Sequence, residues 1–389
     1  MSRNEKLAYL EAIRRRYKKS NRNQKAKILD EFCAVCGYNR KYAIRILKKR
    51  ISKQKSKPGR KYRYDREMLL KVLKTIWLGT DQMCSKKLKI AIGEWLPHYE
   101  KEYGFLADDI RGQLYAISPA TIDRLLKPLR VKYPSKGLSG TKPGRLLKNQ
   151  IPIKTDNWDI TQPGFLEADT VAHCGNSLAG DFVWSLTMTD ILTSWTENRA
   201  TWNKGAEGVV KQIKNIEKSL PFELLGCDCD NGSEFLNYHL IRYFMKRDKP
   251  VQFTRSRAYH KNDNAHVEQK NWTHVRHLFG YDRLDNPALV DLMNDLYANE
   301  WSLYQNHFCP VMKLIEKRKI NSRYCKKYDK PTTPYRRVTS SKHITEEIKA
   351  NLRKRHKTLN PFELKRIIDK KLKAIFKLVT IITKVRKRL

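Results

Sequence analysis

Apolar residues near the N-terminus recur three and four positions apart, which predicts an amphipathic helix with Ile28, Phe32 and Val35 on its buried side. Gly37 interrupts this pattern, and Asn39 can cap a second helix with the sequence RKYAIRILKKR. Basic side chains recur on one face of that second helix, as in a helix that enters a DNA groove. We therefore predict a DNA-binding helix-turn-helix unit, with a merely solvated basic helix as the alternative. It covers residues 1–60, and its expected DNA contacts are Arg40, Lys41, Arg45 and Lys48.

A second helix-turn-helix unit is predicted over residues 61–130. Two helical patterns precede Ser118, which can cap a third helix that has Pro119 at its first position. Apolar residues on one side of this third helix face inward, and basic residues on the other side face out. The basic residues that we expect to contact DNA are Arg124 and Lys127.

The hydrophobic pattern changes between residues 163 and 280. Three short apolar and β-branched runs with turn residues between them predict an antiparallel meander. Helical and strand patterns then alternate, so that three strands are followed by αβαβα. This order is typical of a ribonuclease-H-like fold. We predict that residues 161–305 form the α/β catalytic core of a multidomain α/β protein.

The last part of the chain, residues 306–389, is predicted to be a basic C-terminal region. Residues 310–338 are basic and interrupted by proline, which indicates a small β unit or an extended arm. Asn360 and Glu363 have the spacing of a capping box that opens a basic helix to about residue 378. No separate function follows from this pattern.

The net charge of +40 is distributed unevenly along the 389 residues. Residues 1–160 carry +24, residues 161–300 carry −4 and residues 301–389 carry +20. A polyanionic partner is the simplest cause of such basic flanks, whereas an enzyme that concentrates carboxylates to hold metal ions explains the acidic centre. The Gly-, Pro- and Lys-rich segment 131–160 is predicted to be a basic linker that lies along phosphates.

Composition narrows the class of protein further. No apolar stretch of about 18 uncharged residues occurs, and the N-terminal segment lacks the apolar core of a signal peptide, so we expect a soluble cytoplasmic protein with no membrane partner. Eight cysteines scattered through a chain without an export signal indicate free thiols. Cys33 and Cys36 have zinc-like spacing, but no second pair follows nearby, so we favour helix residues packed inward.

Three acidic residues fall at positions where the predicted sheet can bring them together. Asp169 lies in the first strand, Asp230 ends the fourth strand, and Glu268 lies in the helix after the fifth. The first and fourth strands can be neighbours in such a sheet, and the helix can carry Glu268 over them. Because three adjacent carboxylates repel each other unless cations bind, we predict two Mg²⁺ ions about 3.5–4 Å apart.

The segments around these residues resemble the acidic motifs of integrase-core transposases of bacterial insertion sequences, the D,D-35-E group of the retroviral-integrase superfamily. They read LEADT around Asp169, CDCDNGSEF around Asp230 and RAYHKNDNAHVEQKNW around Glu268, and the last two acidic residues are separated by 37 others. The resemblance covers residues 160–300 closely and implies that all three residues are catalytic and metal-binding. Cys229 and Ala258 depart from the more usual serine and proline, and neither departure removes a ligand.

Other acidic residues are alternatives for the same site. Glu167 and Asp228 each lie two residues before a predicted ligand, so they share its strand face and could point at the metal instead. The motif match favours Asp169 and Asp230. We expect Asp190 to be a hydrogen-bonding residue after the second strand and Glu234 to be a helix-start carboxylate.

The helix that carries Glu268 offers further candidate contacts. Asn271 and Trp272 follow it by about one turn and are predicted DNA contacts at the active edge, although Trp272 could equally belong to the core. On the other side, basic residues recur at helical spacing, and we expect that face to be solvated or to face phosphates. Its members are His266, Lys270, His274 and His277.

The resemblance implies a DNA transposase with Mg²⁺ as cofactor, which Mn²⁺ could replace. Water would attack the phosphodiester at the element's end, and the freed 3′ hydroxyl would attack target DNA. The expected partners are the double-stranded terminal repeats, the target DNA and further copies of the chain on DNA. A transposon-derived DNA-binding regulator and a ribonuclease-H-like nuclease are the alternatives. An intact triad disfavours the regulator, and paired helix-turn-helix units disfavour the nuclease.

Overall fold

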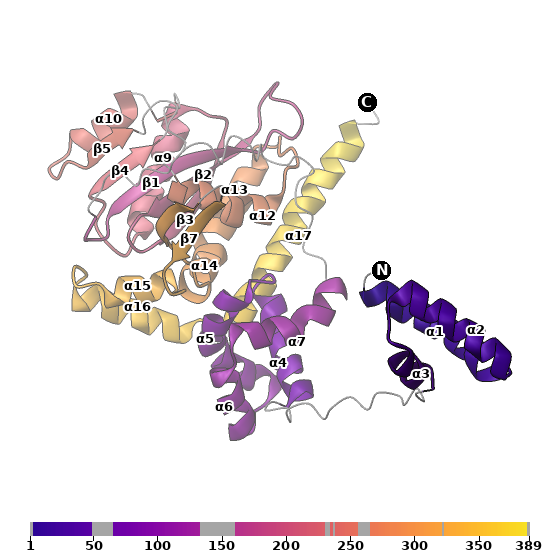
Figure 1. Cartoon of the computed structure of the whole chain (residues 1–389). Helices are drawn as coiled ribbons and strands as arrows, with labels where there is room; N and C mark the ends of the chain where they lie inside the picture. The colour runs from indigo at the N-terminus through magenta and orange to yellow at the C-terminus, as the bar shows by residue number, and fades with distance from the viewer. Residues whose placement is uncertain are drawn as a thin grey trace. The chain divides into compact units, whose positions relative to one another are not determined.

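The structure is a computed structural model, and it divides into two compact units, residues 1–63 and 64–389, which are described separately below (Figure 1). Among the described residues, no helix has the length and apolar character that crossing a membrane requires. The predicted linker falls almost wholly outside the described residues. These are 3–48, 65–132, 160–229, 234–235, 238–255, 265–320 and 323–386.

The N-terminal unit contains three helices, α1 (Arg3–Lys19), α2 (Arg22–Cys36) and α3 (Arg40–Lys48). Gly37 ends α2 in the left-handed region at φ +67°, and its N–H donates to the carbonyl of Cys33. Asn39 then accepts a hydrogen bond from the N–H of Lys41, as the expected cap of α3. Ile28 and Phe32 are buried as predicted, but Val35 is 47% exposed, and Cys36 takes the inward position instead.

Four further helices begin the second unit: α4 (Arg66–Gly79), α5 (Ser85–Tyr103), α6 (Asp108–Ala116) and α7 (Pro119–Lys132). Ser118 caps α7 through its Oγ, which accepts from the N–H of Thr121 at 3.2 Å. Trp95 of α5 is fully buried and donates to the carbonyl of Phe308 at 3.2 Å. These four helices therefore share one hydrophobic core with residues more than two hundred positions later in the chain.

A five-stranded mixed sheet forms the centre of the second unit. Its strands are β1 (Phe165–Ala172), β2 (Val183–Asp190), β3 (Thr196–Trp202), β4 (Gly226–Cys229) and β5 (Gln252–Arg255). The order across the sheet is β3-β2-β1-β4-β5, with β1 to β3 antiparallel and β4 and β5 parallel to β1. The expected meander is confirmed, and so is the expected contact between the first and fourth strands.

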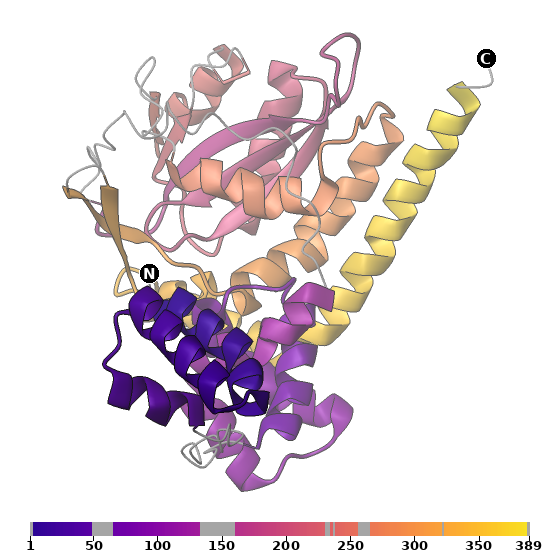
Figure 2. The ribbon, with the colours of Figure 1, turned by 45° about the vertical axis from the view of Figure 1, so that its right-hand side comes forward.

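Helices cover the two faces of this sheet (Figures 1 and 2). On one face, Leu166 and Ala168 of β1 pack in a core with α9 (Ala206–Ser219) and α10 (Tyr238–Met245). On the other lies α11 (Ala265–Lys270), which continues through a π-helical segment, η1 (Asn271–Arg276), into α12 (His277–Phe279). Because side chains alternate along a strand, Glu167 and Asp169 of β1 face α11 and η1.

The remaining elements pack around this centre. They are α13 (Ala288–Leu296), η2 (Tyr297–Trp301), α14 (Ser302–Phe308), β6 (Leu314–Ile320), β7 (Arg323–Tyr328), α15 (Pro334–Ser340), α16 (Glu346–Thr358) and α17 (Pro361–Arg386). The antiparallel hairpin β6–β7 is the small β unit that the sequence predicts. Asn360 caps α17 by accepting from the N–H of Phe362 at 3.0 Å. The helix runs beyond residue 378, along α13 and past α4 and α5 (Figure 1).

Candidate active site

Asp169 lies at the middle of β1 and is held from two directions. Its Oδ1 accepts from the N–H of Thr170 at 2.7 Å, and its Oδ2 accepts from Nδ2 of Asn271 at 2.7 Å. Asn271 is the first residue of η1, so this hydrogen bond ties the helix to the sheet at Asp169. The side chain of Asp169 is only partly buried, which leaves it accessible for chemistry.

Glu268 lies in the first turn of α11, three residues before Asn271, and is exposed. Side chains at i and i+3 of a helix are neighbours on one face, with Cβ atoms roughly 5–6 Å apart. Since Asn271 contacts Asp169 directly, Glu268 belongs to the helix face that borders Asp169. The structure therefore carries Glu268 on the helix that contacts Asp169 through Asn271.

Asp230, the third predicted ligand, lies outside the described residues. In the sequence it directly follows Cys229, the last residue of β4. Cys229 pairs with Ala168 in the parallel ladder. Ala168 in turn precedes Asp169. The role of Asp230 in a metal site stays a prediction, as do the roles of Asp169 and Glu268.

The two alternative carboxylates have other partners. Glu167 is 3% exposed, and its Oε2 accepts from the N–H of Val267 at 2.9 Å, so it satisfies a donor in the first turn of α11. Asp228 is its neighbour across the β1–β4 ladder, is 8% exposed and accepts from Thr254 Oγ1 at 2.7 Å. Both are less accessible than Asp169, and Glu167 positions the helix that carries Glu268.

Asp190 has the structural role that the sequence predicts. Its carboxylate accepts from the N–H of Gly164 at 2.8 Å, and from both the N–H and Oγ1 of Thr193 at 2.6 Å. Burial raises the pKa of Asp190, and these hydrogen bonds oppose that effect. The residue fastens the turn between β2 and β3.

The expectation that Glu234 is a helix-start carboxylate is wrong. The helix α10 begins later, at Tyr238, and Glu234 is 1% exposed. Its Oε1 accepts from Thr170 Oγ1 at 2.9 Å and pairs with Lys204 Nζ at 2.8 Å. Glu234 thus connects the segment after β4 to the residue that follows Asp169 in β1.

The expectation of a solvated basic face on the helix after β5 is wrong for two of its four members, Lys270 and His274. Lys270 is 5% exposed and His274 is 3% exposed, and the ring of His274 meets that of Trp301 at 6.1 Å between centroids. Burial lowers the pKa of Lys270 to about 7 and lowers the pKa of His274. His277 is exposed, and the side chain of His266 lies outside the described residues. Lys270 and His274 therefore belong to the protein interior, whereas His277 lies at the surface as expected.

The predicted DNA contacts differ in their surroundings. Lys41, Arg45 and Lys48 are exposed on the side of α3 opposite the buried Ala43 and Leu47. Arg40 is exposed but pairs with Asp30.

In the second unit, Arg124 and Lys127 are exposed, whereas the inward residues of α7 are buried. Trp272 is 38% exposed and therefore outside the core, while Asn271 is turned inward onto Asp169. A contact between Asn271 and DNA stays a prediction.

The donor set around Asp169 suits a hard divalent cation, because carboxylate and amide oxygens are the ligands of Mg²⁺ and Mn²⁺. Within the described ranges, no three His, Cys, Asp or Glu side chains lie close enough together to hold a metal ion, and Asp230 is not within those ranges. In the N-terminal unit, Cys36 is buried and Cys33 half-buried, as inward helix residues.

Comparison with known proteins places the chain in a family. No protein-family model matches it. The uncharacterized protein y4rM of Sinorhizobium fredii (strain NBRC 101917 / NGR234) is 39% identical over 334 residues, which are 84% of this chain and 93% of that protein. The chain belongs to the y4rM family. The name of this relative assigns no activity. The function of the y4rM-family chain must therefore be inferred from its own residues.

Two solved structures with some likeness to this y4rM-family member are integrase catalytic core domains. The HTLV-2 integrase catalytic core domain in complex with magnesium (dimeric form) is 15% identical and matches 38% of this chain and 90% of its own length, with a TM-score of 0.27. The catalytic core domain of BIV integrase is 14% identical and matches 46% of this chain and 96% of its own length, with a TM-score of 0.28. Scores this low support no argument about the y4rM-family chain.

Two residues at this site gain roles that the sequence did not indicate. Asn271 holds Asp169 through its amide, and Glu167 holds the first turn of α11. The spacing of three between Glu268 and Asn271 was a usable signal, because it places both on one helix face. The role of Glu167 had no signal, since its partner is a backbone N–H one hundred residues away.

Proposed function

We propose that this protein is a DNA strand-transferase of the transposase type, which hydrolyses a phosphodiester at an element's end and joins the freed 3′ hydroxyl to target DNA. The observation that supports this most is the hydrogen bond from Asn271 to Asp169 with Glu268 one turn away. It brings two widely separated acidic motifs to one edge of the β1–β4 ladder.

Asp169, Asp230 and Glu268 are the residues that would hold divalent cations. By analogy with enzymes that use two metal ions, we expect two Mg²⁺ ions. Bound there, the ions would lower the pKa of water, orient the attacking oxygen and stabilise the leaving 3′ oxygen. Asn271 would keep Asp169 in one orientation. Glu167 would fix the first turn of α11, so that Glu268 projects from a rigid helix.

The reaction balances without an energy cofactor. In the first step, the oxygen of water bonds to phosphorus as the bond from phosphorus to the 3′ oxygen breaks, and the 3′ oxygen takes up a proton. In the second step, that 3′ hydroxyl loses its proton and bonds to a target phosphorus, while the target's own 3′ oxygen leaves. One phosphodiester is exchanged for another.

The exposed basic face of α3 would bind the element's ends. Lys41, Arg45 and Lys48 project from one side of a helix whose other side is packed on α1 and α2. Arg124 and Lys127 of α7 would contribute in the same way. Such contacts to phosphates make affinity depend steeply on salt.

The test uses the purified full chain with a labelled duplex that carries a terminal repeat from the gene's own flanks, and a supercoiled plasmid as target. We expect 3′-end cutting and joined products in Mg²⁺ or Mn²⁺, and no product in a chelator. Full activity in the chelator would contradict the metal requirement. Specific end binding without cutting or joining in either metal would favour the transposon-derived regulator instead.

A further inference from the structure

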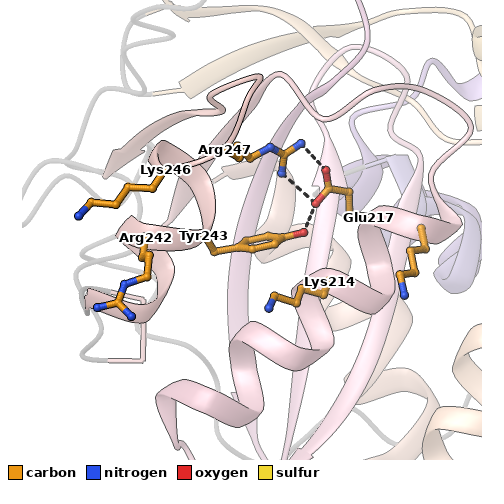
Figure 3. A pocket seen from close by; sticks show the side chains of 7 residues that line it. Lys214, Glu217, Arg242, Tyr243, Lys246 and Arg247 are labelled. Atoms are coloured by element: carbon orange, nitrogen blue, oxygen red, sulfur yellow. Dashed lines mark hydrogen bonds and ion pairs between the residues drawn. The ribbon is translucent and has the colours of Figure 1, made fainter.

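A basic groove is lined by residues of α9 and by residues of α10 and the segment directly after it (Figure 3). Its volume is about 660 Å³ and it is open to solvent. Five of the side chains that line it are cationic and one is anionic, so it carries a local excess of positive charge. From α9 these are Lys214, Glu217 and Lys218, and from α10 and its C-terminal end Arg242, Lys246 and Arg247.

The one carboxylate that lines the groove, Glu217, is already neutralised. Arg247 pairs with Glu217 at 2.7 Å and 3.2 Å, and the hydroxyl of Tyr243 donates to the same carboxylate. Figure 3 shows both side chains converging on Glu217, whereas Arg242 and Lys246 extend away from it. Glu217 therefore does not compensate the other cations of the groove.

Four cations remain on the rim: Lys214, Lys218, Arg242 and Lys246. All four are exposed, and among the described residues none of them forms an ion pair with a carboxylate. Lys214 lies over the ring of Tyr243, with its Nζ 5.1 Å from the centroid. Like charges on neighbouring helix turns are unfavourable unless an anion binds between them, and within the described ranges no carboxylate pairs with any of these four cations.

The spacing of these cations suits a polymeric anion. Each helix carries its two rim cations four residues apart, which is about 6 Å along the helix axis. A strand of duplex DNA presents one phosphate per 3.4 Å or so of its axis, so each pair of cations spans about two phosphates. An open groove with flexible lysines matches a backbone that passes over it, rather than a small anion that must be enclosed.

We propose that this groove binds the phosphodiester backbone of duplex DNA, as a surface additional to the acidic site and to the basic face of α3. The proposal rests on the proposed function in taking DNA as the substrate. It predicts contacts that depend on charge and not on base sequence, because phosphates carry no sequence information. A second segment of DNA, such as the target or the flank of the element, would thereby be held by the catalytic unit.

The first test is lysine acetylation of the wild-type full chain, followed by mass spectrometry, with and without a duplex of random sequence and in the absence of divalent metal. We expect the duplex to protect Lys214, Lys218 and Lys246, and to leave Lys354 and Lys357 of α16 as reactive as before. Equal reactivity of the groove lysines with and without the duplex would overturn the proposal. So would equal protection by inorganic phosphate at the same total phosphate concentration.

The second test replaces all four rim cations by glutamine: Lys214→Gln, Lys218→Gln, Arg242→Gln and Lys246→Gln. The slope of log affinity against log salt should fall by up to about 3.6, because each lost phosphate contact removes about 0.9. The matched control removes four exposed cations on or beside α16: Lys342→Gln, Lys354→Gln, Arg355→Gln and Lys357→Gln. An equal fall in the control would assign the effect to total charge and overturn the proposal.

Failure of the groove and failure of the proposed function give different results. If the groove does not bind DNA, strand transfer by the wild type persists while the groove lysines stay unprotected from acetylation. If the proposed function is wrong, no strand transfer occurs, yet protection and the change in salt slope still report on the groove. Glu268→Gln should show the same lysine protection as the wild type, since it leaves the groove untouched.

Discussion

The two faces of β1 differ in the roles of their side chains, although these side chains alternate along one strand. Leu166 and Ala168 are fully buried in the core that α9 and α10 complete. Glu167 and Asp169, which alternate with them, receive hydrogen bonds from α11 and η1. The apolar face supplies stability, and the polar face positions a helix and leaves one carboxylate accessible. A single eight-residue strand thus serves as scaffold and as candidate site.

The largest expected effect comes from the polar face. Glu268→Gln should abolish end cutting and strand transfer, because loss of a metal ligand removes several kcal/mol of transition-state stabilisation, or about 10³-fold in rate. End binding should stay nearly unchanged, since the substitution keeps the shape of the side chain. Both quantities can be measured with one labelled terminal repeat, by gel assays of cutting and of complex formation.

A matched control exists for this substitution. Glu347 is likewise exposed in the first turn of a helix, α16, and Glu347→Gln removes the same charge far along the chain. It should keep near-normal activity, because a carboxylate in this position is worth about 0.3–1 kcal/mol to the helix. An inactive Glu347→Gln beside an active Glu268→Gln would show that the wrong glutamate is assigned.

The apolar face should respond in stability instead. Leu166→Ala is expected to lower the free energy of unfolding by roughly 2–5 kcal/mol, since it removes a fully buried side chain and leaves a cavity. Denaturant unfolding measures this loss. At a temperature where the variant is folded, its rate of strand transfer should stay within a few-fold of wild type. A large loss of rate in the folded variant would erase the distinction between the two faces.

Asn271 tests whether positioning matters apart from ligation. Asn271→Ala removes the hydrogen bond to Asp169 Oδ2 without removing a carboxylate, and we expect a roughly 10- to 100-fold loss of activity. The midpoint of the Mg²⁺ dependence should move to higher concentration, a change that a purely structural role would not cause. An unaltered Mg²⁺ midpoint would contradict the positioning role.

A pH-dependent effect on stability concerns His173, just beyond the end of β1. It is fully buried beside Ser185, and burial lowers its pKa to about 3. Between about pH 3 and its unfolded pKa of about 6.5, the unfolded chain binds a proton that the folded chain does not, so stability falls as pH falls through this window. His173→Gln should reduce that slope by one proton, about 1.4 kcal/mol per pH unit. Unfolding curves from pH 7 to pH 4 would measure it.

The order of elements followed from the sequence, because strand alternation and helix periodicity are local signals. The contact between β1 and β4 is not local, and it followed from the fold class that this order predicts. The inward role of Asp190 did too, since its partner Thr193 lies three residues away. The role of Glu234 did not follow, because Lys204 and Thr170 are brought to it only by the fold.

The helix after β5 shows why its buried basic residues escaped prediction. Regular α-helical spacing placed Lys270 and His274 together on a solvated face. Lys270 and His274 do lie together but are buried, whereas His277, beyond the wider turn of the π-helical segment Asn271–Arg276, is exposed. Residues later in the chain, such as Trp301 beside His274, cover this face. The periodicity of one helix carries no information about such distant neighbours.

The most direct test of the metal-binding role of Asp169 is a change of metal specificity. Asp169→Cys replaces a hard oxygen ligand by a soft sulfur, which binds Mg²⁺ poorly and thiophilic ions well. We expect no strand transfer by this variant in Mg²⁺ alone and measurable strand transfer when Cd²⁺ is added, under conditions in which the wild type stays active and Asp169→Ala stays inactive. Strand transfer by Asp169→Cys or Asp169→Ala at the wild-type rate in Mg²⁺ would contradict the assignment of Asp169 as a metal ligand.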